Sequence, residues 1–207
     1  MSAPADLAVV FDFGGVLIDW DPRYLYRSLF AGREADMEHF LTEICDQAWN
    51  EQQDRGRSFA DGVAELTARH PDWAEMIAAY DQRWPEMLAG SIDGAVAVLR
   101  DVKASGCPLF GLTNWSAEKF PVARDRFAFL DWFDGIVVSG EVGLKKPEPA
   151  IFEHLCQCFD LTPAATVFID DSRANVAAAV DLGFHTLHFE SAVTLRAGLV
   201  DIGVLQG

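Results

Sequence analysis

Residues 9–20 read VVFDFGGVLIDW: an apolar run meets an acidic residue, a phenylalanine, a pair of glycines and a second apolar run. A short apolar run bounded by turn residues is typical of a strand buried in a parallel sheet. Asp12 would then lie at the carboxyl end of this strand, the edge at which open α/β sheets bind their ligands. Gly14 has no side chain, so this strand end offers a single carboxylate.

The same type of apolar run recurs four times in the second half of the chain, and helical patterns lie between these runs. We expect the further strands at residues 108–114, 135–141, 166–172 and 185–189, and helices at residues 92–105, 116–130, 149–159 and 173–183. Strands that alternate with helices in this way indicate βαβ units and a parallel sheet. The sequence therefore predicts a doubly wound, Rossmann-like α/β fold.

The first and second of these strands are separated by roughly seventy residues, far more than a single crossover helix needs. That stretch has helical patterns, including a capping sequence, SFAD, that begins at Ser58. We therefore expect a helical cap at residues 20–89, inserted into a core formed by residues 1–19 and 90–207. Four of the six tryptophans fall in or beside this segment and are expected to pack in its interior: Trp20, Trp49, Trp73 and Trp84.

The composition narrows the classes of protein to which the chain can belong. Its 207 residues suffice for one domain with an inserted subdomain, and half of them are hydrophobic. The formal net charge of −16 makes nucleic acid and anionic membrane surfaces poor partners. No apolar run reaches the roughly 18 residues that span a bilayer, and the N-terminal residues do not resemble a signal peptide. We expect a cytoplasmic monomer or homodimer with reduced, mostly buried cysteines; a disulfide or redox pair is the alternative.

Polar side chains gather at the expected carboxyl ends of the strands. Besides Asp12, these are Thr113, Asn114, Ser139, Glu141, Asp170 and Asp171. Any one of them alone could cap the helix that follows its strand. Two adjacent acids repel each other unless a cation lies near them, and together with Asp12 they suit a hard divalent cation such as Mg²⁺. Lys146, in the stretch GLKKPEP, is the cation that the sequence itself supplies nearby.

Four stretches, taken in order, resemble the four motifs of the haloacid dehalogenase-like (HAD) hydrolases. They are FDFGGVL at residues 11–17, LTN at 112–114, KKPEP at 145–149 and FIDDSRAN at 168–175. The helical segment at residues 20–89 is similar in position to the type 1 cap of that family. The resemblance implies a Mg²⁺-dependent phosphatase that acts on a small phosphorylated metabolite through an aspartyl-phosphate intermediate.

The resemblance also implies a role for each residue that binds or attacks the phosphate. Asp12 would be the nucleophile, and Lys146 would neutralise both the nucleophile and the phosphate. Thr113 and the backbone at Asn114 would bind phosphate oxygens. Phosphoryl transfer depends mainly on positioning and charge neutralisation, and this set of residues supplies both.

The metal site that the resemblance implies draws its carboxylates from two strand ends. Asp12 and Asp171 would bind Mg²⁺, with Asp170 supporting them, and the backbone carbonyl of Gly14 would be a further ligand. Asn175 occupies a position that often holds another acid near the metal in this family.

Gly14 is a departure from the usual phosphatase pattern of the family, because most members carry a second aspartate there. That aspartate protonates the leaving oxygen and then activates water, a contribution worth about 10²–10⁴-fold in rate. A branch that includes glucose-1-phosphate phosphatases resembles this chain in having glycine at this position. An anomeric leaving group is more acidic than an ordinary alcohol, so the resemblance favours a small sugar phosphate as substrate.

Two other functions stay open at this point. Dehalogenases of the family also lack the second aspartate, and their nucleophile displaces halide from a 2-haloacid without a metal. The chain could instead be a non-catalytic module that binds phosphate or a protein partner. Asp19 and Asp21 follow the first motif closely, but we expect them at the hinge of the cap, with Asp21 capping a helix that starts at Pro22.

The polar stretch NEQQDRGRSF at residues 50–59 is the part of the cap that we expect to face the substrate. Gln52, Arg55 and Arg57 could bind sugar hydroxyls or a second anionic group, and Arg55 is the residue that we select for contact with the phosphate. The alternative is an ordinary connection between two helices.

Overall fold

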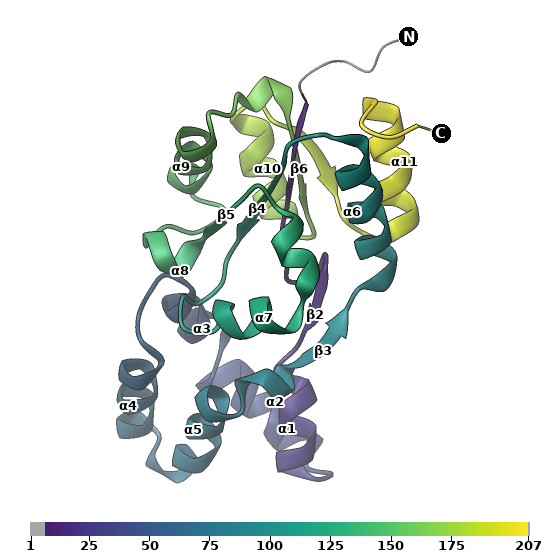
Figure 1. Ribbon diagram of the computed structural model, residues 1–207. Helices are drawn as coiled ribbons and strands as arrows, with labels where there is room; N and C mark the ends of the chain where they lie inside the picture. The colour runs from purple at the N-terminus through teal and green to yellow at the C-terminus, as the bar shows by residue number, and fades with distance from the viewer. Residues whose placement is uncertain (1–6, 207) are drawn as a thin grey trace.

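The computed structural model describes residues 7–206 as a parallel sheet with helices on both faces and a helical segment at one end (Figure 1). Five strands follow the order β5-β4-β1-β6-β7, and every neighbouring pair is parallel. Their bounds are Ala8–Phe11 (β1), Leu109–Thr113 (β4), Gly135–Val138 (β5), Thr166–Asp170 (β6) and His185–His188 (β7). The doubly wound α/β class and the five predicted strands are confirmed, but the strand predicted at residues 135–141 ends at Val138 because a short helix begins at Ser139. Residues 1–6 and 207 of the predicted core lie outside the described residues.

Helices cover both faces of the sheet because side chains alternate along each strand. Val9 and Phe11 of β1 join the larger apolar cluster on one face, whereas Ala8 and Val10 join a smaller cluster on the opposite face. The core helices are α6 (Asp93–Ser105), α7 (Phe120–Arg126), α8 (Ser139–Val142), α9 (Pro149–Phe159), α10 (Arg173–Asp181) and α11 (Ala192–Ile202), with 3₁₀ turns η4 (Ala128–Trp132) and η5 (Pro163–Ala165). The larger cluster includes side chains of α6 and α11, and the smaller one includes side chains of α9 and α10.

The helix predicted at residues 116–130 is shorter in the structure. Helix α7 begins only at Phe120, with Pro121 in its first turn, where a proline has no intrahelical hydrogen bond to lose. It ends before Phe127, whose backbone is extended, and a 3₁₀ turn follows.

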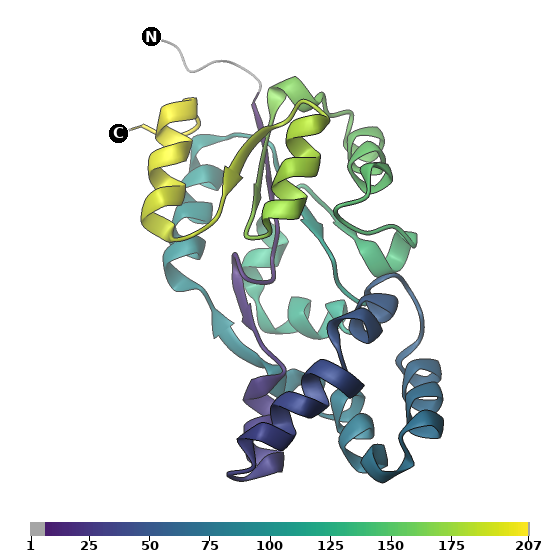
Figure 2. The same cartoon turned by 180° about the vertical axis from the view of Figure 1, so that it is seen from behind.

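The helical segment, residues 20–89, lies beyond the carboxyl ends of the strands in both views (Figures 1 and 2). We call it the helical insert. Its elements are α1 (Arg23–Phe30), α2 (Glu34–His39), η1 (Phe40–Ile44), α3 (Gln47–Asp54), α4 (Phe59–Arg69), η2 (Pro71–Trp73), α5 (Ala74–Gln82) and η3 (Trp84–Met87). Its interior is aromatic: the ring of Tyr80 lies 5.0 Å from Trp49 and stacks on Phe59. Trp49 and Trp84 are buried as expected, whereas Trp20 and Trp73 are only partly buried.

A two-stranded antiparallel ribbon joins the helical insert to the sheet. It pairs β2 (Ile18–Trp20) with β3 (Leu88–Ser91), and the sequence analysis did not predict it. The reason is that β3 reads LAGS, a stretch with no strand-like pattern. Asp19 lies in β2, and the Asp21 carboxylate accepts a hydrogen bond of 2.8 Å from the backbone N–H of Arg23. Asp21 therefore binds the first N–H of α1, but the helix begins at Arg23 and its N-cap residue is Pro22 rather than the expected Asp21.

Two further expectations concern the chain as a whole. Within residues 7–206, every helix is too short or too polar to pass through a bilayer. All four cysteines are free of disulfides, but only Cys45 is buried; Cys158 is exposed, so the expectation of mostly buried thiols was wrong. Cys158 lies near the carboxyl end of α9.

Candidate active site

Asp12 follows the central strand and is held in place by its neighbours. Its backbone N–H donates to the carbonyl of Ile169 at 2.9 Å, so the β1–β6 ladder continues to this residue. Its Oδ1 accepts hydrogen bonds from the backbone N–H of Phe13 at 2.7 Å and from the Lys146 ammonium at 2.8 Å. Burial raises the pKa of Asp12, and the positive charge of Lys146 opposes that rise. The carboxylate is thus fixed at the sheet edge with its charge partly compensated.

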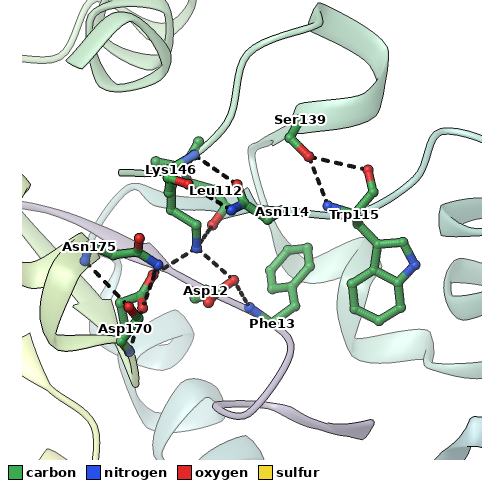
Figure 3. Close-up of polar contacts among 10 residues, drawn as sticks. Asp12, Phe13, Leu112, Asn114, Trp115, Ser139, Lys146, Asp170 and Asn175 are labelled. Carbon is green, nitrogen blue, oxygen red and sulfur yellow. Dashed lines mark hydrogen bonds and ion pairs between the residues drawn. The ribbon is translucent and has the colours of Figure 1, made fainter. Parts of the chain in front are cut away.

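Lys146 reaches Asp12 from the loop between α8 and α9 (Figure 3). Its Nζ lies 2.8 Å from Asp12 Oδ1 and 2.7 Å from Asp170 Oδ2, and it also donates to the carbonyl of Leu112 at 2.9 Å. The side chain is buried, and these three acceptors match the three donors of an ammonium group. Burial lowers the pKa of Lys146, but the attraction of Asp12 and Asp170 outweighs it, so the net shift is upward. Lys146 therefore stays protonated between two carboxylates.

Asn114 uses its side-chain amide to position Lys146. Its Nδ2 donates to the Lys146 carbonyl at 3.0 Å, and its Oδ1 accepts from the Lys146 backbone N–H at 2.9 Å. Thr113, the last residue of β4, is buried beside it. The predicted contact between Asn114 and phosphate therefore concerns its backbone N–H, because its side chain already has partners.

Asp170, the last residue of β6, is surrounded by hydrogen-bond donors. Its carboxylate accepts from the backbone N–H of Ser172 at 2.8 Å and from the Asn175 amide at 3.0 and 3.1 Å, in addition to Lys146. Asn175 was predicted only as a position near the metal. In the structure it orients Asp170, which in turn orients Lys146.

Asp171 lies directly against Gly15. A Cβ atom added to Gly15 would come within 2.3 Å of Asp171 Oδ2, and the φ angle of Gly15 is +75°. Both the left-handed backbone and the close approach require glycine at this position. Burial and the neighbouring charge of Asp170 raise the pKa of Asp171.

The three carboxylates fit a hard divalent cation. Asp12, Asp170 and Asp171 each offer an oxygen, and these oxygens all lie within 4.8 Å of one another. They face a single ammonium group, so the cluster carries an excess of negative charge that a cation would neutralise. Carboxylate oxygens are the ligands that Mg²⁺ prefers in proteins.

A cavity of about 60 Å³ adjoins this cluster, between the core and the helical insert. The core lines the cavity with Gly14, Asn114, Trp115 and Ser116. The helical insert lines it with Trp20, Asn50, Asp54 and Trp84. The three tryptophans make its wall largely aromatic. The indole nitrogens of Trp20 and Trp115 are buried and have no hydrogen-bond partner among the described residues. The aromatic wall of the cavity therefore suits a ligand with an apolar face.

The stretch NEQQDRGRSF reaches the cavity, but not through the residues that we selected. Asn50 and Asp54 line it, one helical turn apart on α3. Gln52 is exposed, and Arg57 lies over the Trp49 ring and pairs with Glu65. Asp54 was not among the residues predicted to face the substrate, because the packing of α3 against the core decides which of its side chains reach the cavity.

Arg55 forms an ion pair with Glu148 of the core instead of lining the cavity. Two similar pairs, Lys145 with Glu51 and Lys119 with Asp81, also join the core to the helical insert. The proposed contact of Arg55 with substrate therefore stays a prediction.

Comparison with known proteins places this geometry in a family. A family model described as haloacid dehalogenase-like hydrolase matches residues 7–183. The chain is 29% identical over 187 residues to a sesquiterpene phosphatase from Aspergillus oryzae, with 90% of this chain and 91% of that protein covered. It is 24% identical over 203 residues to a D-ribitol-5-phosphate phosphatase from Bacteroides thetaiotaomicron, with 94% and 97% covered.

A crystal structure of a HAD family enzyme from Bacteroides thetaiotaomicron, in complex with magnesium and inorganic phosphate, has the same fold. The TM-score is 0.69 at 24% sequence identity, and the match covers 90% of this chain and 96% of that one. The family model spans most of the sequence and includes every residue of the acidic cluster. The chain therefore belongs to the haloacid dehalogenase-like hydrolases.

Proposed function

We propose that this protein is a Mg²⁺-dependent phosphatase that hydrolyses the phosphate monoester of a small metabolite. The observation that carries the proposal is the Asp12–Lys146–Asp170 arrangement, in which one buried ammonium group lies 2.7–2.8 Å from two carboxylates. A carboxylate that attacks a phosphate must overcome strong charge repulsion, and a fixed cation beside it reduces that repulsion.

Asp12 is the nucleophile in this proposal. Its carboxylate attacks phosphorus, the ester oxygen leaves, and an aspartyl phosphate forms that water then hydrolyses. Lys146 compensates the charge of the nucleophile and of the incoming phosphate, because it is already held next to Asp12. Thr113 and the backbone N–H of Asn114 bind phosphate oxygens at the end of β4.

Asp12, Asp171 and the carbonyl of Gly14 would hold the metal, and Asp170 would support it. The fit rests on the carboxylate oxygens that lie within 4.8 Å of one another. A bound Mg²⁺ would supply positive charge for the phosphoryl oxygens. Gly15 is part of this arrangement, since any side chain there would displace Asp171.

The substrate's leaving group would lie in the tryptophan-lined cavity, covered by residues 20–89 acting as a type 1 cap. Rings of sugars and chains of isoprenoids both offer apolar faces to indoles. The relatives include phosphatases named for a sesquiterpene and for D-ribitol 5-phosphate. We retain a small sugar phosphate, with glycine at position 14, as the specific form of the proposal.

The test incubates the purified protein with glucose 1-phosphate, ribitol 5-phosphate, farnesyl phosphate and p-nitrophenyl phosphate, in Mg²⁺ or in EDTA. Phosphate release should disappear in EDTA, and Asp12→Asn should reduce kcat by about 10⁶-fold, the scale on which loss of a nucleophile acts. Asp36→Asn, at an exposed acid of α2, is the matched control. Halide release from 2-chloropropionate in EDTA would favour a dehalogenase, and absence of any hydrolysis would favour a binding module.

A further inference from the structure

The cavity has room for the side chain that position 14 lacks. A Cβ atom added to Gly14 would meet no heavy atom within 4 Å, and Gly14 lines the cavity between the core and the helical insert. Among the described residues that line this cavity, Asp54 alone has an ionisable side chain. We propose that Asp54 of the helical insert supplies the general acid and base of this site in place of an aspartate at position 14. This role rests on the proposed phosphatase function.

Two hydrogen bonds hold Asp54 at the cavity, and a third holds its partner Asn50. One carboxylate oxygen accepts a hydrogen bond of 3.0 Å from the Asn50 amide, whose own oxygen accepts one of 3.1 Å from the Tyr80 hydroxyl on α5. The Asp54 carbonyl accepts a hydrogen bond from the hydroxyl of Ser139 in the core. A carboxyl group has more hydrogen-bonding sites than the Asn50 amide occupies, so it can also bind a ligand.

The surroundings of Asp54 suit proton transfer near neutral pH. Burial raises the pKa of Asp54 to about 7, and the charge of Glu51 adds to the rise. The backbone N–H of Ser116 and the ammonium group of Lys145, both from the core, oppose it. A general acid and base works best when its pKa lies near the working pH, so that both protonation states are available. Asp12, whose neighbour is Lys146, is left free for the attack on phosphorus.

The proposed chemistry balances over the two steps. When an Asp12 oxygen bonds to phosphorus, the bond from phosphorus to the ester oxygen breaks, and the Asp54 carboxylic acid gives its proton to that oxygen. The leaving group departs as a neutral alcohol. Asp54, now a carboxylate, takes a proton from the water that attacks the phosphorus of the aspartyl phosphate. The bond between Asp12 and phosphorus breaks, inorganic phosphate leaves, and both aspartates regain their first protonation states.

The test uses two aromatic substrates of similar shape. Benzyl phosphate must release an alcohol, whereas p-nitrophenyl phosphate releases a weakly basic phenolate that needs no proton. Asp54→Asn should lower kcat/KM for benzyl phosphate by about 10²–10⁴-fold and for p-nitrophenyl phosphate by about 10-fold or less. Because the base that activates water is also lost, the variant should accumulate phosphoenzyme and show a burst of nitrophenolate. Asp72→Asn, at an exposed acid of η2, should behave like the wild type on both substrates.

Each outcome bears on a different claim. Losses of equal size on the two substrates, or no loss, would overturn the role of Asp54 while leaving the phosphatase proposal intact. Wild-type protein that hydrolyses neither substrate in Mg²⁺ would overturn both. Circular dichroism and thermal unfolding of Asp54→Asn show whether a loss of activity comes from unfolding.

A second measurement keeps the proposal falsifiable if Asp54→Asn is poorly folded. Gly14→Asp places an acid in the open space next to position 14 and makes Asp54 redundant for proton transfer. In the Gly14→Asp background, Asp54→Asn should therefore cost at least about 10-fold less in kcat/KM for benzyl phosphate than in the wild type, a coupling that a double-mutant cycle measures. A cost of equal size in both backgrounds would mean that Asp54 has a structural role only.

Discussion

The core side and the insert side of the cavity differ in how their polar residues are held. On the core side, Asp12, Lys146 and Asp170 are buried and joined by contacts of 2.7–2.8 Å. On the insert side, Asp54 depends on one amide from its own helix and on contacts that cross to the core. The core groups are therefore positioned by the sheet itself, whereas the position of Asp54 depends on the insert and the core staying together.

Replacement of Lys146 should have the largest effect on the core side. Lys146→Met leaves two buried carboxylates without their shared cation, and loss of one partner of a buried ion pair costs about 3–5 kcal/mol. We expect a decrease of that size in the free energy of unfolding, measured by urea denaturation in EDTA. Lys103→Met removes an exposed pair with Asp134 and should cost less than about 1 kcal/mol. If Lys146→Met lowered the free energy of unfolding as little as Lys103→Met does, the core network would add no stability.

Burial raises the pKa of Asp12 on the core side as well as that of Asp54, so the contribution of the insert side to the pH dependence of stability is isolated by comparing Asp54→Asn with the wild type. The pKa of Asp54 is raised from 3.8 to about 7, so the folded protein binds more protons than the unfolded chain in that range. Stability from this group is therefore full below about pH 4 and lost as the pH rises through about 7, by up to about 4 kcal/mol. In Asp54→Asn, this decrease in the free energy of unfolding between about pH 4 and pH 7 should disappear when urea denaturation is measured over a series of pH values. If the free energy of unfolding changed with pH in the same way in the wild type and in Asp54→Asn, the raised pKa of Asp54 would be refuted.

The two glycines of the first motif should respond differently to a methyl group. Gly15→Ala forces a left-handed alanine against Asp171, which should cost about 1–3 kcal/mol of stability. Displacement of Asp171 should also weaken Mg²⁺ binding by about 10–100-fold in calorimetric titration. The methyl group of Gly14→Ala would point into open space, so this substitution should change the free energy of unfolding and the Mg²⁺ affinity far less. Similar Mg²⁺ affinities for both variants would exclude Asp171 as a ligand.

The ion pairs that join the helical insert to the core should contribute least to the stability of the protein. Arg55→Gln removes a pair with Glu148 whose side chains are 44% and 39% exposed, and pairs of this kind contribute about 0–1 kcal/mol. If Arg55 binds substrate, as the sequence analysis predicted, its loss should instead raise KM while stability hardly changes. Steady-state kinetics with the best substrate of the panel decides between these results.

The core side of the site was predictable from the sequence. Parallel strands end at the same sheet edge, so strand patterns alone bring Asp12, Thr113 and Asp170 together. Lys146 has no strand of its own; the sequence offered it as a nearby cation, and its role followed from the resemblance of KKPEP to a family motif. The structure adds that Asn114 and Asn175 orient this network through their side-chain amides.

The insert side was not predictable in the same way. Which face of α3 turns toward the core depends on packing between segments far apart in the sequence, and no local pattern encodes it. Asp54 was therefore missed, although its stretch was expected to face the substrate. Trp20, Trp84 and Trp115 were either assigned to a core or not considered, because an indole that lines a cavity and one that fills a core look alike in a sequence.

The ribbon of β2 and β3 has a consequence for how the insert can move. Both connections between insert and core run through it, and they are paired with each other from Ile18–Ser91 to Trp20–Leu88. The chain thus enters and leaves the insert along one strip, and α3 meets α8 through noncovalent contacts on the opposite side of the molecule (Figure 1). Such an attachment leaves a swing about one axis as the easy motion and resists sliding or twisting. A crosslink between α3 and α8 would therefore oppose that swing.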